Sequence, residues 1–212
     1  MPKHYKIAIV GYGNLGFHLL NHLQTAGHTI TQIFTRDKSK YQLSGNTTEF
    51  ISDLKMLNND ADVYLLSVKD DALIEVASQI TLDKKIVAHC SASVEMEVLQ
   101  HCTENFGVFY PLQSFTRNVA IDFTHIPILI EGVNEKTITV LKEIASSLSE
   151  EVLQVNQQQR LAVHVAAVFA NNFSNHLFSV AEEILNKENI SYKILLPLIE
   201  ETVRKVNICI AI

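Results

Sequence analysis

Cysteine is scarce in this 212-residue sequence, and its distribution disfavours two kinds of site. The three cysteines are Cys90, Cys102 and Cys209, an odd number, and no two of them have the CxxC spacing. A disulfide framework and a thiolate zinc site are therefore disfavoured, and we expect no metal. His18 and His22 have the i, i+4 spacing of a metal-ligand pair, but no third ligand accompanies them, so we expect both on the surface. This use of cysteine is typical of a reduced compartment, so we expect a cytoplasmic protein.

Long apolar runs and basic runs are also absent. No uninterrupted apolar stretch reaches the roughly 18 residues that a membrane span requires, and the N-terminus leads at once into a strand-like segment. We therefore expect neither a membrane partner nor a signal peptide. The chain has 17 Lys and Arg against 23 Asp and Glu, a net charge of −6. This balance disfavours a nucleic-acid partner, and phosphate groups would have to be bound locally by backbone amides and a few cations.

Short apolar runs alternate with helical patterns over the first 156 residues. The pattern predicts amphipathic helices at Phe17–Ala26, which closes at Gly27, and at Thr137–Leu148. The expected strands are Lys6–Val10, Thr29–Phe34, a short one near Thr48–Ile51, Val63–Val68, Lys85–His89, Gly107–Tyr110, Ile126–Glu131 and Glu151–Val155. This alternation indicates the α/β class, with a doubly wound, mostly parallel Rossmann sheet and helices on both faces.

Glycine and proline are missing from residues 157–186, which are rich in Ala and Leu. Nothing there would break a helix, so we predict one long helix, followed by a second from about Ser191 or Tyr192 with a kink at Pro197. We therefore expect two domains: residues 1–156 as a nucleotide-binding Rossmann domain and residues 157–212 as a small helical domain.

The clearest motif is a glycine-rich turn between the first strand and the first helix. Residues 11–16 form the pattern G-x-G-x-x-G, made up of Gly11, Tyr12, Gly13, Asn14, Leu15 and Gly16. The first glycine permits a tight turn, the second lets a pyrophosphate approach the backbone, and the third lets the helix pack close to the strand. The amides at the helix N-terminus would bind the phosphates. The alternative is a tight turn that binds nothing.

The end of the second strand indicates which dinucleotide is bound. NAD-binding proteins usually place an acid there, but this position holds Thr35, followed by Arg36, with Lys38 and Ser39 within reach. Guanidinium and hydroxyl donors suit a 2′-phosphate, so we favour NADP over NAD. In the alternative interpretation, Asp37 binds the ribose of NAD and Arg36 is a solvated charge.

Polar residues follow the next strands at the edge where ligands bind in open parallel sheets. Ser67, Val68 and Lys69 end one strand and should border the cofactor. His89 and Ser91 end the next strand and could donate hydrogen bonds to a substrate or cofactor, although Ser91 and Ser93 could instead cap the following helix. Farther on, Gln113, Ser114 and Arg117 are candidates on a loop at the same edge, with a plain surface loop as the alternative.

The long predicted helix carries an unusual polar row. On an ideal α-helix, His164, Asn171 and Asn175 lie near one line, with Asn172 beside it. Reduction of a carbonyl or imine leaves a basic atom that needs a proton, which a histidine can supply. We therefore take His164, Asn172 and His89 as the candidate catalytic residues; a structural role for His164 is the alternative.

Five segments together resemble a known family. They are GYGNLG (11–16), LLSVKDDAL (65–73), HCSAS (89–93), GVFYPLQSF (107–115) and HVAAVFANNFSNHL (164–177). The chain is similar to a bacterial family with a Rossmann-like NADP oxidoreductase domain followed by a helical domain of unknown function. That family groups with 6-phosphogluconate, β-hydroxyacid and prephenate dehydrogenases, pyrroline-5-carboxylate reductase and coenzyme-F420-dependent NADP oxidoreductases.

The resemblance carries further expectations. In the dehydrogenase relatives the helical domain packs against its copy and closes the site, which implies a homodimer through that domain. Hydroxyacid dehydrogenases have a catalytic Lys with Asn four residues later; here His164 and Val168 stand there, and His164 is more similar to the histidine of prephenate dehydrogenases. Relatives continue through further helices, which implies that the helical domain is incomplete here.

These observations predict an NADP-dependent oxidoreductase. Hydride would pass to or from a small carbonyl, imine or hydroxy-acid substrate. The alternatives are a non-catalytic NADP(H)-binding or sensor protein, motivated by the missing Lys/Asn pair, and a flavin- or deazaflavin-linked NADP oxidoreductase.

Overall fold

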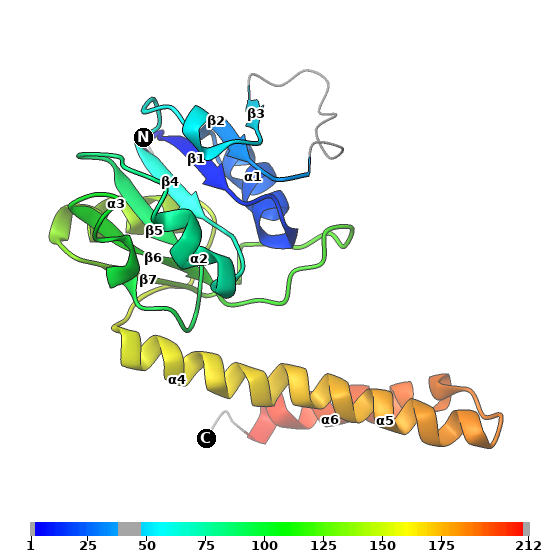
Figure 1. Ribbon diagram of the computed structural model, residues 1–212. Helices are drawn as coiled ribbons and strands as arrows, with labels where there is room; N and C mark the ends of the chain where they lie inside the picture. The colour runs from blue at the N-terminus through cyan, green and yellow to red at the C-terminus, as the bar shows by residue number, and fades with distance from the viewer. Residues whose placement is uncertain (1–2, 38–47, 210–212) are drawn as a thin grey trace. The chain divides into compact units, whose positions relative to one another are not determined.

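The computed structural model describes residues 3–37 and 48–209 (Figure 1). The chain divides into two compact units, Met1–His164 and Val165–Ile212, and each is described by itself. The domain boundary expected from composition, after residue 156, stays a prediction.

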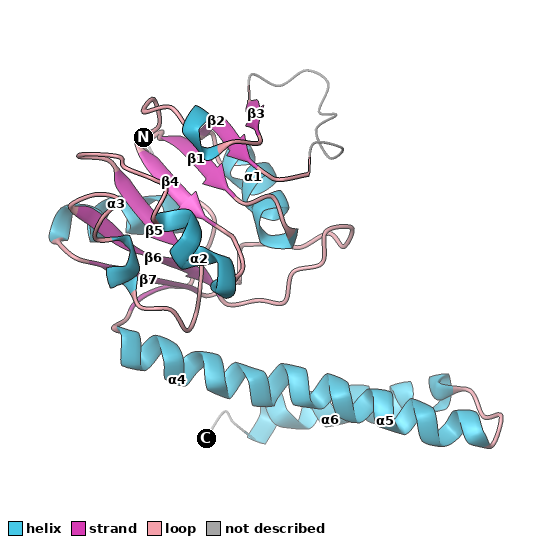
Figure 2. Ribbon diagram, viewed as in Figure 1, coloured by secondary structure: helices cyan, strands magenta, loops and turns pink. Residues whose placement is uncertain are grey.

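The first unit is built on a single eight-stranded sheet, drawn in magenta in Figure 2. The strands lie in the order β3-β2-β1-β4-β5-β6-β7-β8, and all neighbours are parallel except the antiparallel pair β6 and β7. Their bounds are β1 Lys6–Val10, β2 Thr29–Phe34, β3 Glu49–Ile51, β4 Val63–Leu66, β5 Ile86–His89, β6 Asn105–Pro111, β7 Ile128–Gly132 and β8 Val152–Gln154. The order of the first six strands is that of a dinucleotide-binding Rossmann fold, which confirms the predicted fold class.

Helices cover both faces of this sheet because each strand buries side chains in both directions. In β1, Ile7 and Ile9 join the core on the face that carries α1 and α3, whereas Ala8 and Val10 join the core on the face that carries α2. The helices of the first unit are α1 Asn14–Thr25, η2 Leu54–Met56, α2 Asp70–Ala77, η3 Met96–Leu99, α3 Glu135–Ser146 and the start of α4 (Gln157–Ala167), which continues past the last residue of this unit, His164.

The predicted end of the first helix is confirmed in detail. Gly27 has a positive φ of 91°, a conformation that a side chain disfavours. Its amide donates to the carbonyl of Gln24, and the amide of His28 donates to the carbonyl of Leu23. This pair of bonds is a Schellman motif, and it turns the chain directly into β2.

The long C-terminal helix differs from its prediction in the middle. α4 is followed without a break by a π-helical segment, η4 (Val168–Phe173), and then by α5 (Ser174–Lys187). The i to i+5 bonds of a π-helix shift the register, so the polar row calculated on an ideal α-helix does not carry through.

Two shorter segments complete the second unit, η5 (Tyr192–Leu195) and α6 (Leu196–Cys209). The kink expected at Pro197 is wrong, because Pro197 is the second residue of α6, where its missing N–H costs nothing.

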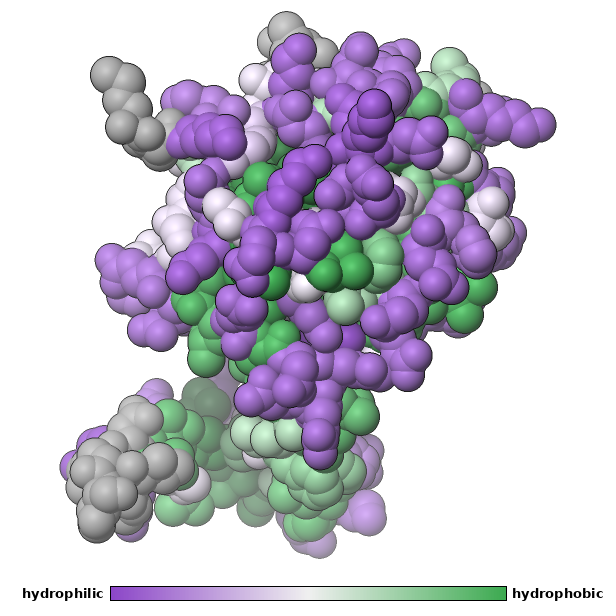
Figure 3. Space-filling view, turned by 90° about the vertical axis from the view of Figure 1, so that its left-hand side faces the viewer, coloured by the Kyte–Doolittle hydropathy of each residue, from purple (hydrophilic) through white to green (hydrophobic). Residues whose placement is uncertain are grey.

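Apolar side chains lie open on the second unit. No side chain described in residues 165–206 is buried, and Phe169, Leu177 and Leu198 are each 64% exposed. Figure 3 shows apolar residues in green over these helices. Among the described residues, no helix is both long and apolar enough to cross a membrane.

Candidate functional site

The glycine-rich turn owes its shape to two backbone contacts. A Cβ on Gly11 would lie 2.7 Å from the carbonyl oxygen of Ser67, and Gly11 also has a φ of 111°. A Cβ on Gly16 would lie 2.1 Å from the carbonyl oxygen of Gly11. The Ser67 hydroxyl donates to that same carbonyl at 2.7 Å. Strand β1, the tip of β4 and the first turn of α1 are therefore packed backbone to backbone.

Gly13 has a different reason to be glycine. A Cβ there would meet nothing within 4 Å, so packing inside the protein does not require its absence. Gly13 is the N-cap of α1 and offers no side chain to the helix amides, whose first bond runs from Phe17 N–H to the Gly13 carbonyl. The amides of Asn14, Leu15 and Gly16 precede that bond in the first turn of α1, so the helix itself gives them no acceptor and a phosphate could supply one.

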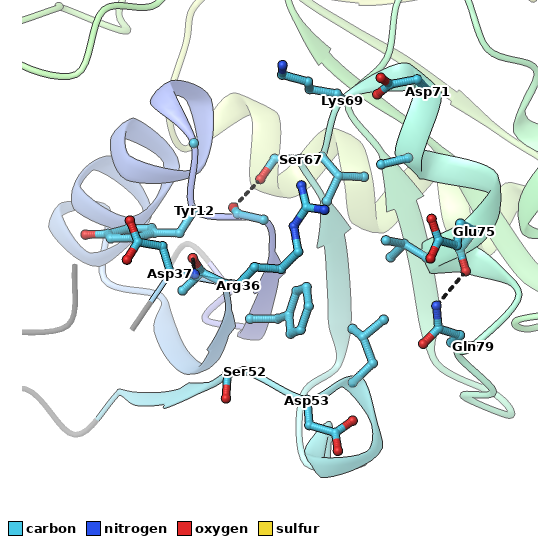
Figure 4. A pocket seen from close by; sticks show the side chains of 18 residues that line it. Tyr12, Arg36, Asp37, Ser52, Asp53, Ser67, Lys69, Asp71, Glu75 and Gln79 are labelled. Atoms are coloured by element: carbon cyan, nitrogen blue, oxygen red, sulfur yellow. Dashed lines mark hydrogen bonds between the residues drawn. The ribbon is translucent and has the colours of Figure 1, made fainter. Parts of the chain in front are cut away.

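A pocket of about 960 Å³ opens beside this turn (Figure 4). Its size suits a nucleotide-sized ligand, and it lies at the carboxyl ends of β1, β2, β3 and β4, where the strand order reverses. The lining residues are Gly11, Tyr12, Gly13, Phe34, Thr35, Arg36, Asp37, Ser52, Asp53, Leu54, Ser67, Val68, Lys69, Asp71, Ala72, Glu75, Val76 and Gln79.

The pocket gathers most of the predicted cofactor residues. The predicted members that line it are Gly11, Tyr12, Gly13, Thr35, Arg36, Ser67, Val68 and Lys69. Asn14, Leu15 and Gly16 follow on the first turn of α1, and neither they nor Ser91 belong to the lining. Ser39 and Lys38 lie outside the described residues.

The end of β2 carries the groups that distinguish the two dinucleotides. Thr35 is 7% exposed, and its hydroxyl accepts a bond from the Asp37 amide at 3.4 Å. Arg36 is exposed, and its side chain extends into the pocket, while Asp37 stands beside it (Figure 4). Arg36 forms no ion pair with another described residue, so its charge is available to an anionic ligand.

A loop after β6 closes over the outside of the glycine-rich turn. The Asn14 side-chain amide donates to the carbonyl of Phe115 at 2.8 Å, and His18 Nε2 lies 3.0 Å from the carbonyl of Thr116. The Arg117 guanidinium lies 4.5 Å from the centre of the Tyr12 ring. Of the predicted loop candidates, Arg117 therefore contacts the turn, whereas Gln113 and Ser114 are exposed and do not line the pocket.

The expectation that His18 and His22 are surface residues is wrong. His18 is 4% exposed, and its ring lies 5.6 Å from that of Phe115. His22 is half-buried against Phe123, and this burial lowers its pKa. Both histidines complete the apolar contact between α1 and the loop. Among residues 3–37 and 48–209, no group of three His, Cys, Asp or Glu side chains is arranged to hold a metal.

The tip of β5 is buried rather than open. His89 has no exposed surface; burial, aided by the charge of Arg160, lowers its pKa to about 4. Its Nδ1 accepts the Ser91 amide at 3.2 Å, and its Nε2 has no hydrogen-bond partner among the described residues. The Ser91 hydroxyl accepts the amides of Ser93 and Val94, so it shapes the loop instead of capping η3.

Arg160 anchors the start of α4 to this loop. It is fully buried, its guanidinium donates to the carbonyls of Ala92 and Val94, and it pairs with Glu131 of β7 at 3.2 Å. Burial lowers the pKa of Arg160 and raises the pKa of Glu131. Sequence reasoning gave Arg160 no role, because its three partners come from distant segments.

A polar cluster stands at the tips of β4, β5 and β6. The Tyr110 hydroxyl lies 3.4 Å from His164 Nδ1, and the Ser93 hydroxyl donates to Asp70 at 2.6 Å. Burial raises the pKa of Tyr110, and the charge of Asp70 acts in the same direction, so the phenol keeps its proton at neutral pH. Sequence reasoning did not identify Tyr110 as a site residue. Its position, one residue before the end of β6 at the ligand-binding edge of the sheet, could have indicated it.

Asn172 belongs to the second unit and lies in η4. It is exposed, and its Oδ1 accepts the side-chain amide of Asn171 at 3.1 Å. Asn171 in turn accepts from Asn175 at 3.3 Å. The asparagines therefore form a connected set within their own unit.

Comparisons with known families fall on both halves of the chain. Residues 6–93 match the family described as NADP oxidoreductase, coenzyme F420-dependent. Residues 126–208 match a domain of unknown function, DUF2520. A comparison with curated proteins found no match.

Solved structures extend the likeness to nearly the whole chain. A protein from Bacteroides fragilis assigned as an NADP oxidoreductase is 35% identical, with a TM-score of 0.89, over 96% of this chain and 81% of that one. The chain belongs to this family of NADP oxidoreductases. The predicted family is thereby confirmed, and so is NADP as its cofactor.

More distant structures share the fold. A 1-pyrroline-5-carboxylate reductase from Streptococcus pyogenes has a TM-score of 0.71 at 14% identity, over 96% of this chain and 78% of that one. A reductive aminase from Aspergillus terreus, in complex with NADPH and ethyl levulinate, has a TM-score of 0.78 at 15% identity, over 99% and 75%. The glycine-rich turn and the pocket at the strand tips therefore stand in a fold that other reductases use.

Proposed function

We propose that this oxidoreductase reduces a carbon–oxygen or carbon–nitrogen double bond of a small molecule with NADPH. The observation that carries the proposal is the pair of Tyr110 and His164, 3.4 Å apart, in the same unit as the nucleotide pocket. Both the pair and the pocket involve the carboxyl edge of one sheet, where a dinucleotide extends across the strand tips.

The chain's own groups hold the cofactor in this proposal. The amides of Asn14, Leu15 and Gly16 bind the pyrophosphate, and Arg36 with Thr35 binds the 2′-phosphate; Ser67, Val68, Lys69 and Ser91 border the remainder. NADPH, when bound, supplies the hydride. Asp37 as a ribose ligand for NAD is the competing assignment for this end of the pocket.

His164 is the proposed proton source. A substrate oxygen or nitrogen becomes basic once its carbon has accepted hydride, and it then takes a proton from the pair formed by Tyr110 and His164. Asn172, the remaining catalytic candidate, lies in the other unit, and its role stays a prediction from the sequence. His89 was a third catalytic candidate, but its burial and its pKa of about 4 favour a role beneath the site.

The substrate class follows from chemistry rather than from any contact. Two proteins that share the fold are a 1-pyrroline-5-carboxylate reductase and a reductive aminase, and these names point to carbon–nitrogen chemistry for them. A donor pair without a metal suits imines and ketones alike, because both need one hydride and one proton.

The test is turnover and binding in His164→Ala. Wild-type protein is assayed for NADPH oxidation with 1-pyrroline-5-carboxylate, keto acids, and ketones mixed with amines. The variant should keep its NADPH affinity and lose about 10²- to 10⁴-fold in turnover, the usual contribution of a general acid. Lost NADPH affinity with unchanged turnover per bound cofactor would assign His164 a structural role.

A second candidate acceptor is a deazaflavin. It is favoured by one observation, the match of residues 6–93 to a family described as coenzyme F420-dependent. Oxidised F420 added to the same assay distinguishes the two, because only a deazaflavin-linked enzyme would oxidise NADPH when F420 is the sole acceptor. NADPH binding without oxidation by any of these acceptors would favour the non-catalytic alternative.

A further inference from the structure

The nucleotide pocket has an acidic wall, which a phosphate-rich ligand alone does not explain. Asp71, Glu75 and Gln79 of α2 and the turn after it line one side, at intervals of four residues. In Figure 4 they stand on the far side of the pocket from Tyr12 and Arg36. Carboxylates close to phosphates cost free energy, so the part of the ligand nearest this wall must carry hydrogen-bond donors.

The surface beside the wall is apolar. Leu54, Val68 and Val76 line the pocket next to the acidic residues, together with Phe34 and Ala72. Such a surface suits a flat ring and does not suit a phosphate or ribose. The base of the dinucleotide is therefore the part that reaches α2, because the phosphates are held at the opposite end by the α1 amides.

Two side chains on the acidic side of the pocket, Glu75 and Gln79, offer hydrogen-bond acceptors to a base bound there. The Gln79 side-chain nitrogen donates to the backbone carbonyl of Glu75 at 3.1 Å, which leaves its oxygen as the outer atom of the amide. Glu75 forms no ion pair with another described residue, and a carboxylate accepts hydrogen bonds only. Asp71, by contrast, lies in the first turn of α2, where the helix dipole already favours an acid.

We propose that Glu75 and Gln79 recognise the adenine of the cofactor through its exocyclic amino group. This inference rests on the proposed use of NADPH and adds a base-specific contact to it. The amino group presents two N–H donors to two acceptors. A hypoxanthine base carries a carbonyl oxygen at that position and would place an acceptor against a carboxylate.

The experiment compares two cofactors whose bases differ at C6, an amino group against a carbonyl, and in the proton that the carbonyl form carries on the adjacent N1. Dissociation constants for NADPH and reduced nicotinamide hypoxanthine dinucleotide phosphate are measured by calorimetry on the full chain. Wild-type protein should bind NADPH at least about 10-fold more tightly, the cost of one unpaired charged acceptor. Glu75→Gln, which can donate as well as accept, should bring the ratio of the two constants close to one.

The matched control is Asp71→Asn, which removes the same charge from the same helix. It should shift both constants together through the phosphates and leave their ratio at the wild-type value. Equal binding of both cofactors by the wild type, or a ratio unchanged in Glu75→Gln, would overturn the proposal. Because no substrate enters this measurement, a protein that discriminates the bases yet turns nothing over would contradict the proposed function alone.

Discussion

Gly13 and Gly16 stand three residues apart in one turn, but they lack side chains for different reasons. At Gly16 the space is filled by the carbonyl of Gly11, 2.1 Å from where a Cβ would lie; at Gly13 the space is empty to 4 Å. Gly16 therefore lacks a side chain because the fold leaves no room for one. At Gly13 the missing side chain leaves space for a group that approaches from outside.

This difference predicts opposite effects of the same substitution. Gly16→Ala must move backbone against backbone and should destabilise the protein by several kcal/mol, on the order of 3. Gly13→Ala should leave the thermal midpoint within about 2 °C and weaken NADPH binding at least about 10-fold. Thermal unfolding and calorimetry measure the two; a stable Gly16→Ala that binds normally would contradict the argument.

His89 gives a prediction about pH. The unfolded chain binds a proton at this residue near pH 6.5, whereas the folded protein does so only near pH 4. Between these values protons favour the unfolded state, so stability falls as pH is lowered, by roughly 3 kcal/mol from this group. The lowered pKa of His28, caused by burial, acts in the same direction.

Urea unfolding at several pH values between 7 and 4 measures this effect. In His89→Asn the side-chain oxygen replaces Nδ1 as the acceptor for the Ser91 amide, while the titrating group is removed. The variant should show the shallower loss of stability. Parallel curves for the two proteins would show that His89 does not titrate as its burial requires.

Residues were predictable from the sequence where the motif is local. The roles of Gly11, Gly13 and Gly16 depend on spacing along a few residues; the geometry shows the tight turn at Gly11 and the close packing at Gly16, and the role of Gly13 stays a prediction. Tyr110 and Arg160 were missed because their partners, His164 and Glu131, become neighbours only through the fold. His18 was misplaced because the loop that buries it is about a hundred residues away.

At the scale of elements, one buried side chain fixes the start of α4. Arg160 ties its first turn to the loop after β5 and to β7. Arg160→Ala would leave Glu131 buried without its partner and two carbonyls unbonded, which should cost about 3–5 kcal/mol of unfolding free energy. Chemical denaturation followed by circular dichroism measures the loss.

Arg204→Ala is the control for this prediction. Arg204 pairs with Glu201 at 2.7 Å, but the pair is exposed on α6 and screened by water. Its removal should change stability far less than the removal of Arg160. Similar losses for the two variants would mean that the buried pair around Glu131 contributes little.

The strands were located well, since each is a short apolar run that the flanking residues delimit. β1 and β2 match their predicted bounds, whereas β4 stops at Leu66, two residues before its predicted end. The π-helical segment could not be predicted, because Ala and Leu favour helix without specifying which carbonyl each amide binds. The antiparallel pairing of β6 and β7 could not be predicted either. It depends on the path of the loop between the two strands and not on the strand sequences.

At the scale of the whole molecule, the second unit predicts self-association. Its apolar side chains, among them Leu177 and Leu198, are too exposed and too numerous for a monomer in water. We expect a homodimer through these helices, as the family resemblance also implies. Light scattering after size-exclusion chromatography should give twice the chain mass of 23.8 kDa.

Charge placed on that surface should break the dimer. Leu177→Asp and Leu198→Asp together should give a monomer, whereas Asn186→Asp, at a polar position of the same unit, should not. A wild-type protein that stays at one chain mass at micromolar concentrations would rule the homodimer out.

The loop after β6 connects two parts of the candidate site, Tyr110 and the glycine-rich turn. Only six residues separate Tyr110 from Arg117, and the Arg117 guanidinium lies over the ring of Tyr12 within the glycine-rich turn. One short segment of chain thus leads from Tyr110, a member of the proposed donor pair, to the turn that is proposed to bind the pyrophosphate. A shift of the glycine-rich turn on dinucleotide binding would therefore reach the Tyr110 hydroxyl through a short covalent segment, so we expect the position of the phenol to change with occupancy of the pocket.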